Sequence, residues 1–367
     1  MRGSNYKYKL LFTGGGTGGH LFPAVAVAEH IKEMKPAAEI LFVGTKNKIE
    51  GKIIPKLGFA FKSIWIQGFY RKFDLRNLLF PVRLIVSLLQ SLFINIVYKP
   101  NIAIGSGGYA AGPVIWAAWI LGAKIILIEQ NSYPGVTTRL LERYANEVHL
   151  SFEDSKKYLK RKEIHRLTGN PIRKNLGTIS KQDASISFGL STEKKTLLVL
   201  GGSLGARSIN NAVKNNFESI VENGIQIIWQ TGKYYYEEYK NLKSNMVKVY
   251  DFIEDMNSAY SACDLLVARA GATTIAEVLV LGIPAVFVPS PNVAGNHQFY
   301  NAKSLSENNA SLLVEDNKIS SQLAKVVSKT ISSKDKLSEL SKKAQELAKP
   351  NAAKEIAESV IKFAEVG

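Results

Sequence analysis

The chain has 367 residues, with 47 Lys and Arg against 31 Asp and Glu, so its formal net charge is +16. This length favours two domains, and 46% hydrophobic with 21% charged residues excludes a disordered chain. The positive excess indicates an anionic partner, but no RNA-binding aromatic signature or zinc-finger spacing accompanies it, so we expect no nucleic-acid partner.

The first half of the chain alternates short apolar runs with helical patterns. A strand over 9–13 leads into the glycine loop Gly14–Gly19 and then a helix over about 23–34. Further strands are predicted over 39–43, 102–104 and 124–128, and a second glycine loop, Gly105–Gly108, opens an apolar helix. Strands that alternate with helices predict parallel βαβ units.

The most apolar stretch covers residues 78–98. It is interrupted by Pro81, Arg83, Gln90 and Asn95, which argues against a membrane-spanning helix. The cations Arg71, Lys72 and Arg76 precede it. Two interpretations stay open: an interfacial membrane contact, or a buried core helix with a basic solvent edge.

The same pattern restarts in the second half. A strand over 196–200 leads into Gly201–Gly205, and strands follow over 225–230, 247–250, 265–268 and 285–288. Each half therefore opens with strand, glycine loop and helix, which predicts two doubly wound domains. We place the domains at 1–169 and 170–350, and expect a last helix over 351–367 to pack back on the first domain. The single cysteine, Cys263, and the absence of a signal-peptide pattern favour a reducing cytoplasm.

Gly14, Gly16 and Gly19 satisfy G-x-G-x-x-G, a loop that brings phosphate to a helix N-terminus. A dinucleotide site also needs an acidic residue after the second strand, where Gly44-Thr45-Lys46 stands, and no G-K-[ST] occurs. Nicotinamide, flavin and P-loop enzymes are thereby disfavoured. A tight packing turn is the alternative for one such loop, but its recurrence favours phosphate binding.

Gly201–Gly205 also matches G-x-S-x-G, the nucleophile elbow of α/β-hydrolases. The chain order Ser203, Asp264, His297 can supply a triad, so a hydrolase with a Ser203 nucleophile is the rival from another class. In the phosphate interpretation, the Ser203 hydroxyl and backbone hold a phosphate instead. The first-half glycine loop, which a hydrolase does not need, favours the second interpretation.

A third loop, residues 269–274, follows a strand and opens a helix that carries Glu277. Small hydroxyl residues at a helix N-terminus suit a diphosphate, and the Glu277 carboxylate can accept ribose hydroxyls. A plain first-turn helix carboxylate is the alternative. No D-x-D or H-E-x-x-H pattern occurs, so we expect no metal site, and a diphosphate neutralised by helix ends and arginine.

In their order from about residue 9 to 305, these motifs resemble the MurG family. The residues that carry the resemblance are 14–20, 105–109 with 112–113, 129–131, 169–173, 201–205, 252–256, 269–277 and 297–301. The resemblance implies an α/β GT-B fold, two Rossmann-like domains whose parallel sheets face across a cleft. The first would be the acceptor and membrane domain and the second the UDP-sugar donor domain.

The resemblance also implies an activity. It is the inverting transfer of N-acetylglucosamine from UDP-N-acetylglucosamine (UDP-GlcNAc) to the C4 hydroxyl of the muramoyl sugar of lipid I. The product is lipid II, and no cofactor or metal is required. It implies a peripheral enzyme on the anionic cytoplasmic face of the bacterial membrane, docked through residues 69–97 and associated with other cell-wall enzymes. A related GT-B enzyme that glycosylates another membrane lipid is a further alternative.

Site residues follow from the same resemblance. Donor contacts would fall on Thr17, Gly18, Gly19, Asn131, Arg173, Ser203, Ile253, Ala272, Thr273, Thr274, Ile275, Ala276, Glu277 and Gln298. Gly16, Gly107, Gly108 and Tyr109 would lie by the acceptor. Ile253 would offer backbone groups to uracil, while Asn131 and Gln298 would hold sugar hydroxyls.

Two side chains are candidates for the general base. His20 is the first, because an imidazole titrates near neutral pH, although a hydrogen-bonded loop histidine is the alternative. Glu129 is the second. Asn296 stands where the family commonly has an aspartate, which weakens any charged role at that position.

Overall fold

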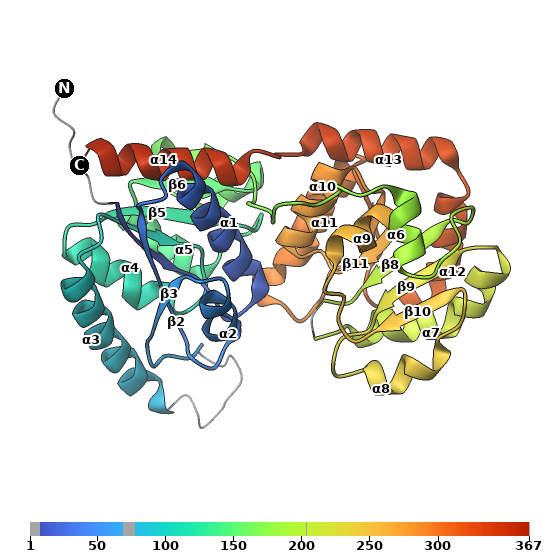
Figure 1. Cartoon of the computed structure of the whole chain (residues 1–367), viewed down its shortest axis with the longest axis horizontal. Helices are drawn as coiled ribbons and strands as arrows, with labels where there is room; N and C mark the ends of the chain where they lie inside the picture. Colours follow the sequence, from blue (N-terminus) through green and yellow to red (C-terminus); the bar gives the residue numbers. More distant parts are fainter. Residues whose placement is uncertain (1–7, 69–77, 203, 367) are drawn as a thin grey trace. The chain divides into compact units, whose positions relative to one another are not determined.

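The computed structural model describes residues 8–68, 78–202 and 204–366 (Figure 1). Contacts divide the chain into two compact units. Unit 1 comprises Met1–Arg173 and Lys349–Gly367, and unit 2 comprises Lys174–Ala348. The second unit is therefore inserted, in sequence, into the first.

Unit 1 is built on a parallel sheet with strand order β3-β2-β1-β4-β5-β6-β7. The strands are β1 (Lys9–Thr13), β2 (Glu39–Gly44), β3 (Ala60–Ser63), β4 (Ile102–Gly105), β5 (Lys124–Glu129), β6 (Glu147–Leu150) and β7 (His165–Leu167). The central strand β1 pairs with β2 on one side and with β4 on the other. The strand order reverses between β1 and β4, which is where ligands bind in open α/β sheets.

Helices cover both faces of this sheet (Figure 1). They are α1 (Gly18–Met34), α2 (Ile49–Lys56), α3 (Phe80–Tyr98), α4 (Ala111–Ile120), α5 (Val136–Leu141) and α14 (Ala352–Val366). Alternate residues of a strand face opposite ways. Leu10 of β1 accordingly packs in one core with Ile356 and Val360 of α14, while Leu11 packs in the other with Val114 of α4.

Helix α3 has its polar side inward. Ser87, Ser91 and Asn95 recur every four residues and are buried, in a helix that contacts α4. The opposite face is an exposed apolar stripe, made of Val82, Ile85, Leu89, Phe93, Ile96 and Val97. The predicted alternative, a buried core helix with a basic solvent edge, is therefore wrong.

The polar residues that argued against membrane spanning are held by the protein. Gln90 Oε1 accepts a hydrogen bond of 2.7 Å from the backbone N–H of Trp65, and the Arg83 guanidinium lies 5.3 Å from the centre of the Trp65 ring. By length and composition, α3 is long and apolar enough to cross a membrane, and it alone among the helices of residues 8–68, 78–202 and 204–366. Only 17% of the most apolar 18-residue stretch of this helix is buried.

Unit 2 repeats the architecture with strand order β10-β9-β8-β11-β12-β13, again parallel. Its strands are β8 (Thr196–Leu200), β9 (Gln226–Gln230), β10 (Val247–Tyr250), β11 (Leu265–Ala268), β12 (Ala285–Phe287) and β13 (Leu312–Leu313). Its helices are α6 (Lys181–Ser187), α7 (Arg207–Glu222), α8 (Tyr236–Tyr239), α9 (Met256–Ala262), α10 (Ala272–Leu281), α11 (His297–Glu307), α12 (Ile319–Ile331) and α13 (Lys334–Leu347). The strand order reverses between β8 and β11.

Candidate active site

Two glycine loops meet at the carboxyl edge of the unit 1 sheet, after β1 and after β4. Their approach is so close that a Cβ atom on Gly14 would lie 1.8 Å from Ser106 Oγ. Gly108 has φ +82°, and a Cβ there would lie 2.5 Å from the carbonyl oxygen of Gly15. Both positions need glycine because a larger side chain would clash with the other loop, and Gly108 also has a left-handed conformation. The two predicted loops therefore pack directly against each other.

Helix α1 begins inside the first glycine loop, at Gly18, and not near Pro23 as predicted. Thr17 precedes it in an extended conformation and makes no side-chain capping bond, so the first-turn N–H groups face the loop. The Tyr109 ring lies 3.4 Å from where a Cβ of Gly16 would stand. Predicted donor and acceptor residues of unit 1 are thus neighbours at a helix N-terminus suited to phosphate.

Arg173, a predicted donor contact, lies near the same helix. Its guanidinium carbon is 5.5 Å from the centre of the Phe22 ring in α1. A Cβ on Gly18 would in turn approach that ring to 2.9 Å. The arginine therefore lies beside the Phe22 ring, near the N-terminal end of α1, where it adds positive charge.

His20 occupies the first turn of α1 and is half-buried. Its Nδ1 lies 3.0 Å from Oε1 of Gln130, and its backbone oxygen accepts a bond of 2.6 Å from Ser106 Oγ. A Cβ on Gly107 would lie 2.8 Å from the same Nδ1. The imidazole is therefore positioned by both loops and by Gln130, which belongs to the 129–131 motif but was given no predicted role of its own.

The other base candidate, Glu129, ends β5 and is buried. Its Oε1 accepts bonds from the backbone and side-chain nitrogens of Asn131 at 3.0 and 3.3 Å, and its Oε2 accepts one from Gly135 N at 3.0 Å. A carboxylate so surrounded by backbone donors shapes a loop. His20 therefore stays the first candidate for the base, and the Glu129 carboxylate orients Asn131.

Glu50 of α2 is a site residue that the sequence analysis missed. It is buried, and its Oε2 accepts a bond of 2.9 Å from Gly16 N. Its Oε1 accepts bonds from the nitrogen and hydroxyl of Thr45 at 3.0 and 2.6 Å. Thr45 lies where a dinucleotide enzyme would carry its acidic residue, so a carboxylate reaches this region from α2 instead. Its oxygens are occupied by the N–H groups of Gly16 and Thr45 and by the Thr45 hydroxyl.

In unit 2, the loop after β8 is joined to the loop after β10 by Gln230. The Gln230 amide donates to Gly202 O at 3.2 Å and accepts from Ile253 N at 2.8 Å. Ile253 was predicted to offer backbone groups to uracil, and its N–H is bonded to Gln230 here. Ser203 lies outside the described residues.

Helix α10 starts directly after the loop that follows β11. Gly271 precedes it in an extended conformation without a side-chain cap, as Thr17 does in unit 1. Ala272 and Ile275 are buried, whereas Thr273, Thr274 and Ala276 are partly exposed. Thr273 Oγ1 has no hydrogen-bond partner among the described residues. The predicted donor contacts at 272–276 therefore lie at a helix N-terminus. Only the side chains of Thr273, Thr274 and Ala276 are partly exposed to solvent there.

Glu277 lies in the second turn of α10 and is buried. Tyr260 of α9 donates a hydroxyl bond of 2.8 Å to Glu277 Oε2. This contact fixes the orientation of the carboxylate. The role of Tyr260 could not be predicted from the sequence, because Tyr260 and Glu277 are 17 residues apart on different helices.

Arg269 anchors the loop before α10, and Gln298 at the start of α11 binds the loop that follows β12. The Arg269 guanidinium donates to Asp316, to Val288 O at 3.0 Å and to Ser208 Oγ at 2.8 Å. Gln298 Oε1 accepts a bond of 2.9 Å from Ser290 N. Asn296 adopts φ 52°, a left-handed conformation that asparagine tolerates well.

The hydrolase triad is not assembled. Asp264 precedes β11 at the amino edge of the sheet, where it accepts bonds from Thr196 N at 2.8 Å and Lys195 Nζ at 2.9 Å. The Gly201–Gly205 loop follows β8 at the opposite edge, and a strand of that length spans about 17 Å. The carboxylate is thus too far away to orient a histidine beside that loop.

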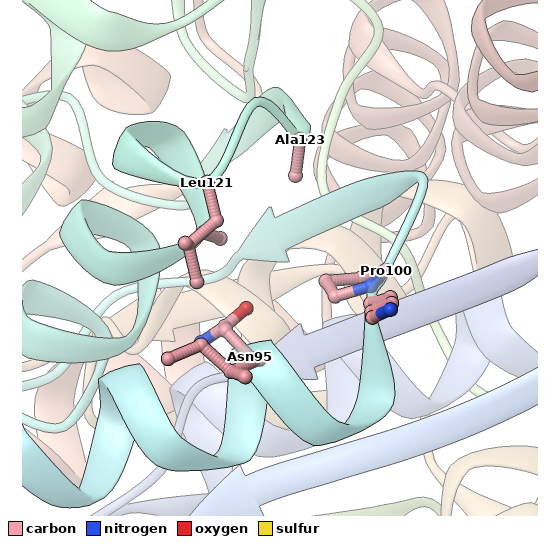
Figure 2. Close-up of a pocket in the computed structure, with 7 residues that line it drawn as sticks. Asn95, Pro100, Leu121 and Ala123 are labelled. Carbon is pink, nitrogen blue, oxygen red and sulfur yellow. The ribbon is translucent and has the colours of Figure 1, made fainter.

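No group of three or more His, Cys, Asp or Glu side chains with metal-binding geometry occurs among the described residues. A pocket of about 290 Å³ lies elsewhere in unit 1, lined by Asn95, Ile96, Lys99, Pro100, Ala118, Leu121 and Ala123 (Figure 2). Pro100 and Ala123 precede β4 and β5, so this pocket is at the amino edge of the sheet. The glycine loops are at the carboxyl edge, and the pocket is therefore separate from them.

Comparisons with known proteins match both units. Residues 10–150 match the glycosyltransferase family 28 N-terminal domain, and residues 196–356 match its C-terminal domain. The chain is 40% identical over 363 residues to a Flavobacterium psychrophilum protein, covering 98% of each chain. It is 42% identical over 365 residues to one from Bacteroides thetaiotaomicron, covering 97% of this chain and 98% of the other. Both bear the name UDP-N-acetylglucosamine--N-acetylmuramyl-(pentapeptide) pyrophosphoryl-undecaprenol N-acetylglucosamine transferase.

Solved structures agree on the fold. Acinetobacter baumannii MurG superposes with a TM-score of 0.76 at 27% identity, covering 96% of this chain and 99% of that one. The calicheamicin glycosyltransferase CalG4 gives 0.73 at 10% identity, covering 100% and 99%, a likeness of fold alone. The predicted GT-B fold class and glycosyltransferase activity are confirmed, and the hydrolase alternative is not supported. The chain belongs to glycosyltransferase family 28 and, within it, to the MurG family.

Proposed function

We propose that this enzyme transfers N-acetylglucosamine from UDP-GlcNAc to the C4 hydroxyl of the muramoyl sugar of lipid I. The observation that carries the proposal is the pair of uncapped helix N-termini, α1 and α10, each at the point where its sheet reverses strand order. Such termini bind phosphate, and both substrates carry a diphosphate. The names of relatives at about 40% identity supply the sugar and the acceptor.

Each unit has a distinct part in this proposal. Unit 2 binds UDP-GlcNAc through α10, with Glu277 on the ribose and Gln298 on the sugar. Unit 1 holds the acceptor diphosphate at Gly16, Gly107 and Gly108. The domain ranges 1–169 with 351–367, and 170–350, keep the roles of acceptor and donor domain.

The reaction inverts the anomeric centre in one displacement. The acceptor oxygen forms a bond to C1 of the sugar and gives up its proton to a base. The bond from C1 to the diphosphate oxygen breaks, and its electron pair leaves with UDP. Helix N-termini and arginine stabilise the charge on the departing diphosphate, so that no metal is required.

The lipid acceptor requires access to a bilayer, and α3 supplies a surface for it. Leu89 and Phe93 of the apolar stripe are 62% and 69% exposed. The lysines and arginines of the chain outnumber its acidic residues, which favours an anionic membrane. The buried serines of α3 pack on unit 1, so we propose that the helix lies on the cytoplasmic face of the membrane rather than crossing it. Arg71, Lys72 and Arg76, also proposed for this contact, lie outside the described residues.

The decisive experiment incubates the purified enzyme with labelled UDP-GlcNAc and lipid I. Release of UDP with matching formation of lipid II is expected. A parallel incubation with undecaprenyl phosphate-linked lipids that lack the muramoyl sugar should give no product. Transfer to those lipids and none to lipid I would instead favour a related enzyme that glycosylates another membrane lipid.

A further inference from the structure

We infer that Gln130 is a positioning residue that fixes the tautomer of His20, so that Nε2 is the unprotonated, basic nitrogen of the ring. The inference rests on the proposed function for its catalytic part. Its structural part, the assignment of hydrogens, stands on the contacts of Gln130 alone.

The orientation of the Gln130 amide follows from its partners. Its Nε2 lies 3.0 Å from the carbonyl oxygen of Ser106 and 3.0 Å from that of Ile128. Carbonyl oxygens only accept hydrogen bonds, so the atom that faces them must be the NH₂ group, which has two hydrogens to donate. A flipped amide would set its oxygen against two others. Gln130 is buried, so water cannot relieve that repulsion.

The amide oxygen is then the atom that faces His20. Gln130 Oε1 lies 3.0 Å from His20 Nδ1. An amide oxygen carries no hydrogen, so the hydrogen of this bond must belong to Nδ1. A neutral imidazole has one N–H, and Nε2 is therefore left with a lone pair. Among the described residues, none forms a hydrogen bond with that nitrogen.

The position of the His20 ring is fixed as well as its tautomer. Ser106 donates its hydroxyl to the backbone oxygen of His20 at 2.6 Å, and Ser106 is itself fully buried. Gly107, at φ +93°, leaves room for the ring, because a Cβ there would lie 2.8 Å from Nδ1. A general base needs its accepting nitrogen unprotonated and aimed before the substrate arrives, and this arrangement provides both.

The neutral amide has a consequence for the proton transfer. In the proposed reaction, Nε2 takes the acceptor hydroxyl proton as the new bond to C1 forms, and the ring becomes a cation. Gln130 stabilises that cation through one hydrogen bond, without the full charge that a carboxylate partner would supply. It therefore orients the base without placing a charge beside it.

Nitrogen-15 NMR of the histidine rings tests the tautomer directly. At a pH where His20 is neutral, we expect the wild-type enzyme to carry its hydrogen on Nδ1. Gln130→Met keeps the side-chain length and removes the acceptor, so the hydrogen should move wholly or partly to Nε2. Ser106→Ala is the matched control: it removes a bond to the His20 backbone, and the ring tautomer should stay as in the wild type.

Kinetics test the catalytic part. Gln130→Met should lower kcat by at least ~10-fold, within the ~10²–10⁴-fold that a general base contributes, with UDP affinity unchanged.

Several results would overturn the inference. A wild-type hydrogen on Nε2 refutes the assignment, and an unchanged tautomer in Gln130→Met refutes the role of Gln130. A changed tautomer with unchanged kcat refutes the catalytic part. Failure of the wild-type enzyme to use lipid I would refute the proposed function instead, and the NMR result would still stand.

Discussion

Glu50 Oε2 accepts a hydrogen bond from the backbone N–H of Gly16, 34 residues earlier in the chain, across 2.9 Å. The bond fixes a glycine with φ +83° at the centre of the first glycine loop, Gly14–Gly19. Because the same carboxylate binds Thr45 twice, it joins the ends of β1 and β2 beneath that loop. The shape of the loop therefore depends on a buried charge supplied by α2.

Replacement of Glu50 by glutamine should destabilise unit 1 and impair the enzyme together. The amide has one acceptor oxygen for three donors and sets an NH₂ group against an N–H, which costs about 1–3 kcal/mol in unfolding free energy. Urea unfolding and kcat/KM for the acceptor measure the two effects. Glu153→Gln, a surface carboxylate of the same unit, should change neither. Full activity in Glu50→Gln would contradict the role of Glu50 in loop shape.

Replacement of Glu277 by alanine should weaken UDP binding by ~1.5–3 kcal/mol, the scale of a hydrogen bond to a charged group. Tyr260→Phe keeps the carboxylate and removes only the hydroxyl that orients it, so its loss should be smaller, ~0.5–1.5 kcal/mol. Calorimetry with UDP gives both values, and Tyr234→Phe, on an exposed ring of unit 2, is the control. Equal UDP affinity in the wild type and in Glu277→Ala would remove the ribose assignment.

The apolar stripe should control membrane binding. Changing Ile85, Leu89 and Phe93 together to serine should reduce binding to phosphatidylglycerol vesicles by at least about tenfold, since each buried apolar side chain contributes about 1.5–3 kcal/mol. The fold and UDP affinity should persist, because these side chains are exposed. Sedimentation with vesicles measures the bound fraction, and Ile186→Ser, an exposed apolar residue of unit 2, is the control.

Charge should act separately from the stripe. Replacing Arg71, Lys72 and Arg76 with glutamate should remove the salt-sensitive part of vesicle binding, with each cation worth roughly 1 kcal/mol near anionic lipid. If the serine variant and the glutamate variant both bind vesicles as the wild type does, residues 69–97 are not the docking surface. A fall in UDP affinity in either variant would point to a folding defect.

Transfer should survive a strong chelator. Helix N-termini carry partial positive charge that can stabilise the departing diphosphate without a metal. Rates of UDP release in EDTA and in added magnesium should agree. Complete loss of transfer in EDTA, restored by magnesium or manganese, would overturn the proposed stabilisation of the leaving group.

Acid should weaken unit 1 through His149. Burial in β6, with a smaller effect from the Arg166 cation, lowers the pKa of this imidazole from 6.5 to about 3. The unfolded chain therefore binds the proton first as pH falls, so the contribution of His149 is complete above about pH 6.5 and is lost progressively towards pH 3. The loss is at most about 1.4 kcal/mol per pH unit.

His149→Gln should flatten this pH dependence of the unfolding free energy between neutral pH and about pH 5. Urea unfolding at several pH values gives the slope. An identical slope in wild type and His149→Gln would show that other groups control the acid response.

The sequence predicted the strands that are buried on both faces, because they read as continuous apolar runs. Ile125–Ile128 in β5 is such a run. Strand β6 was missed because Glu147 and His149 interrupt its pattern, and β13 because it has two residues. The start of α1 was missed because glycine has low helix propensity, and the first two residues of this helix are Gly18 and Gly19.

The same limit applies to the site. The glycine loops are local sequence patterns and could be predicted. The side chains that hold these loops and His20 in place come from distant parts of the sequence. Gln130 and His20 are 110 residues apart, and Glu50 and Gly16 are 34 apart, so only the fold brings them together. Composition gave α3 two interpretations, because the face of a helix that meets the core depends on its neighbour, α4, and not on its own sequence.

The last helix sets the order in which the chain can fold as it is synthesised. Ile356 and Val360 of α14 complete the core around Leu10 and Phe12, yet they leave the ribosome after the whole of unit 2. Unit 2 can complete its core first. Until α14 is synthesised, the apolar side chains of β1 and α1 that pack against it stay exposed. Translation that stops within α13 would therefore yield an aggregation-prone chain and not a shorter enzyme, because the core around β1 is completed only by α14.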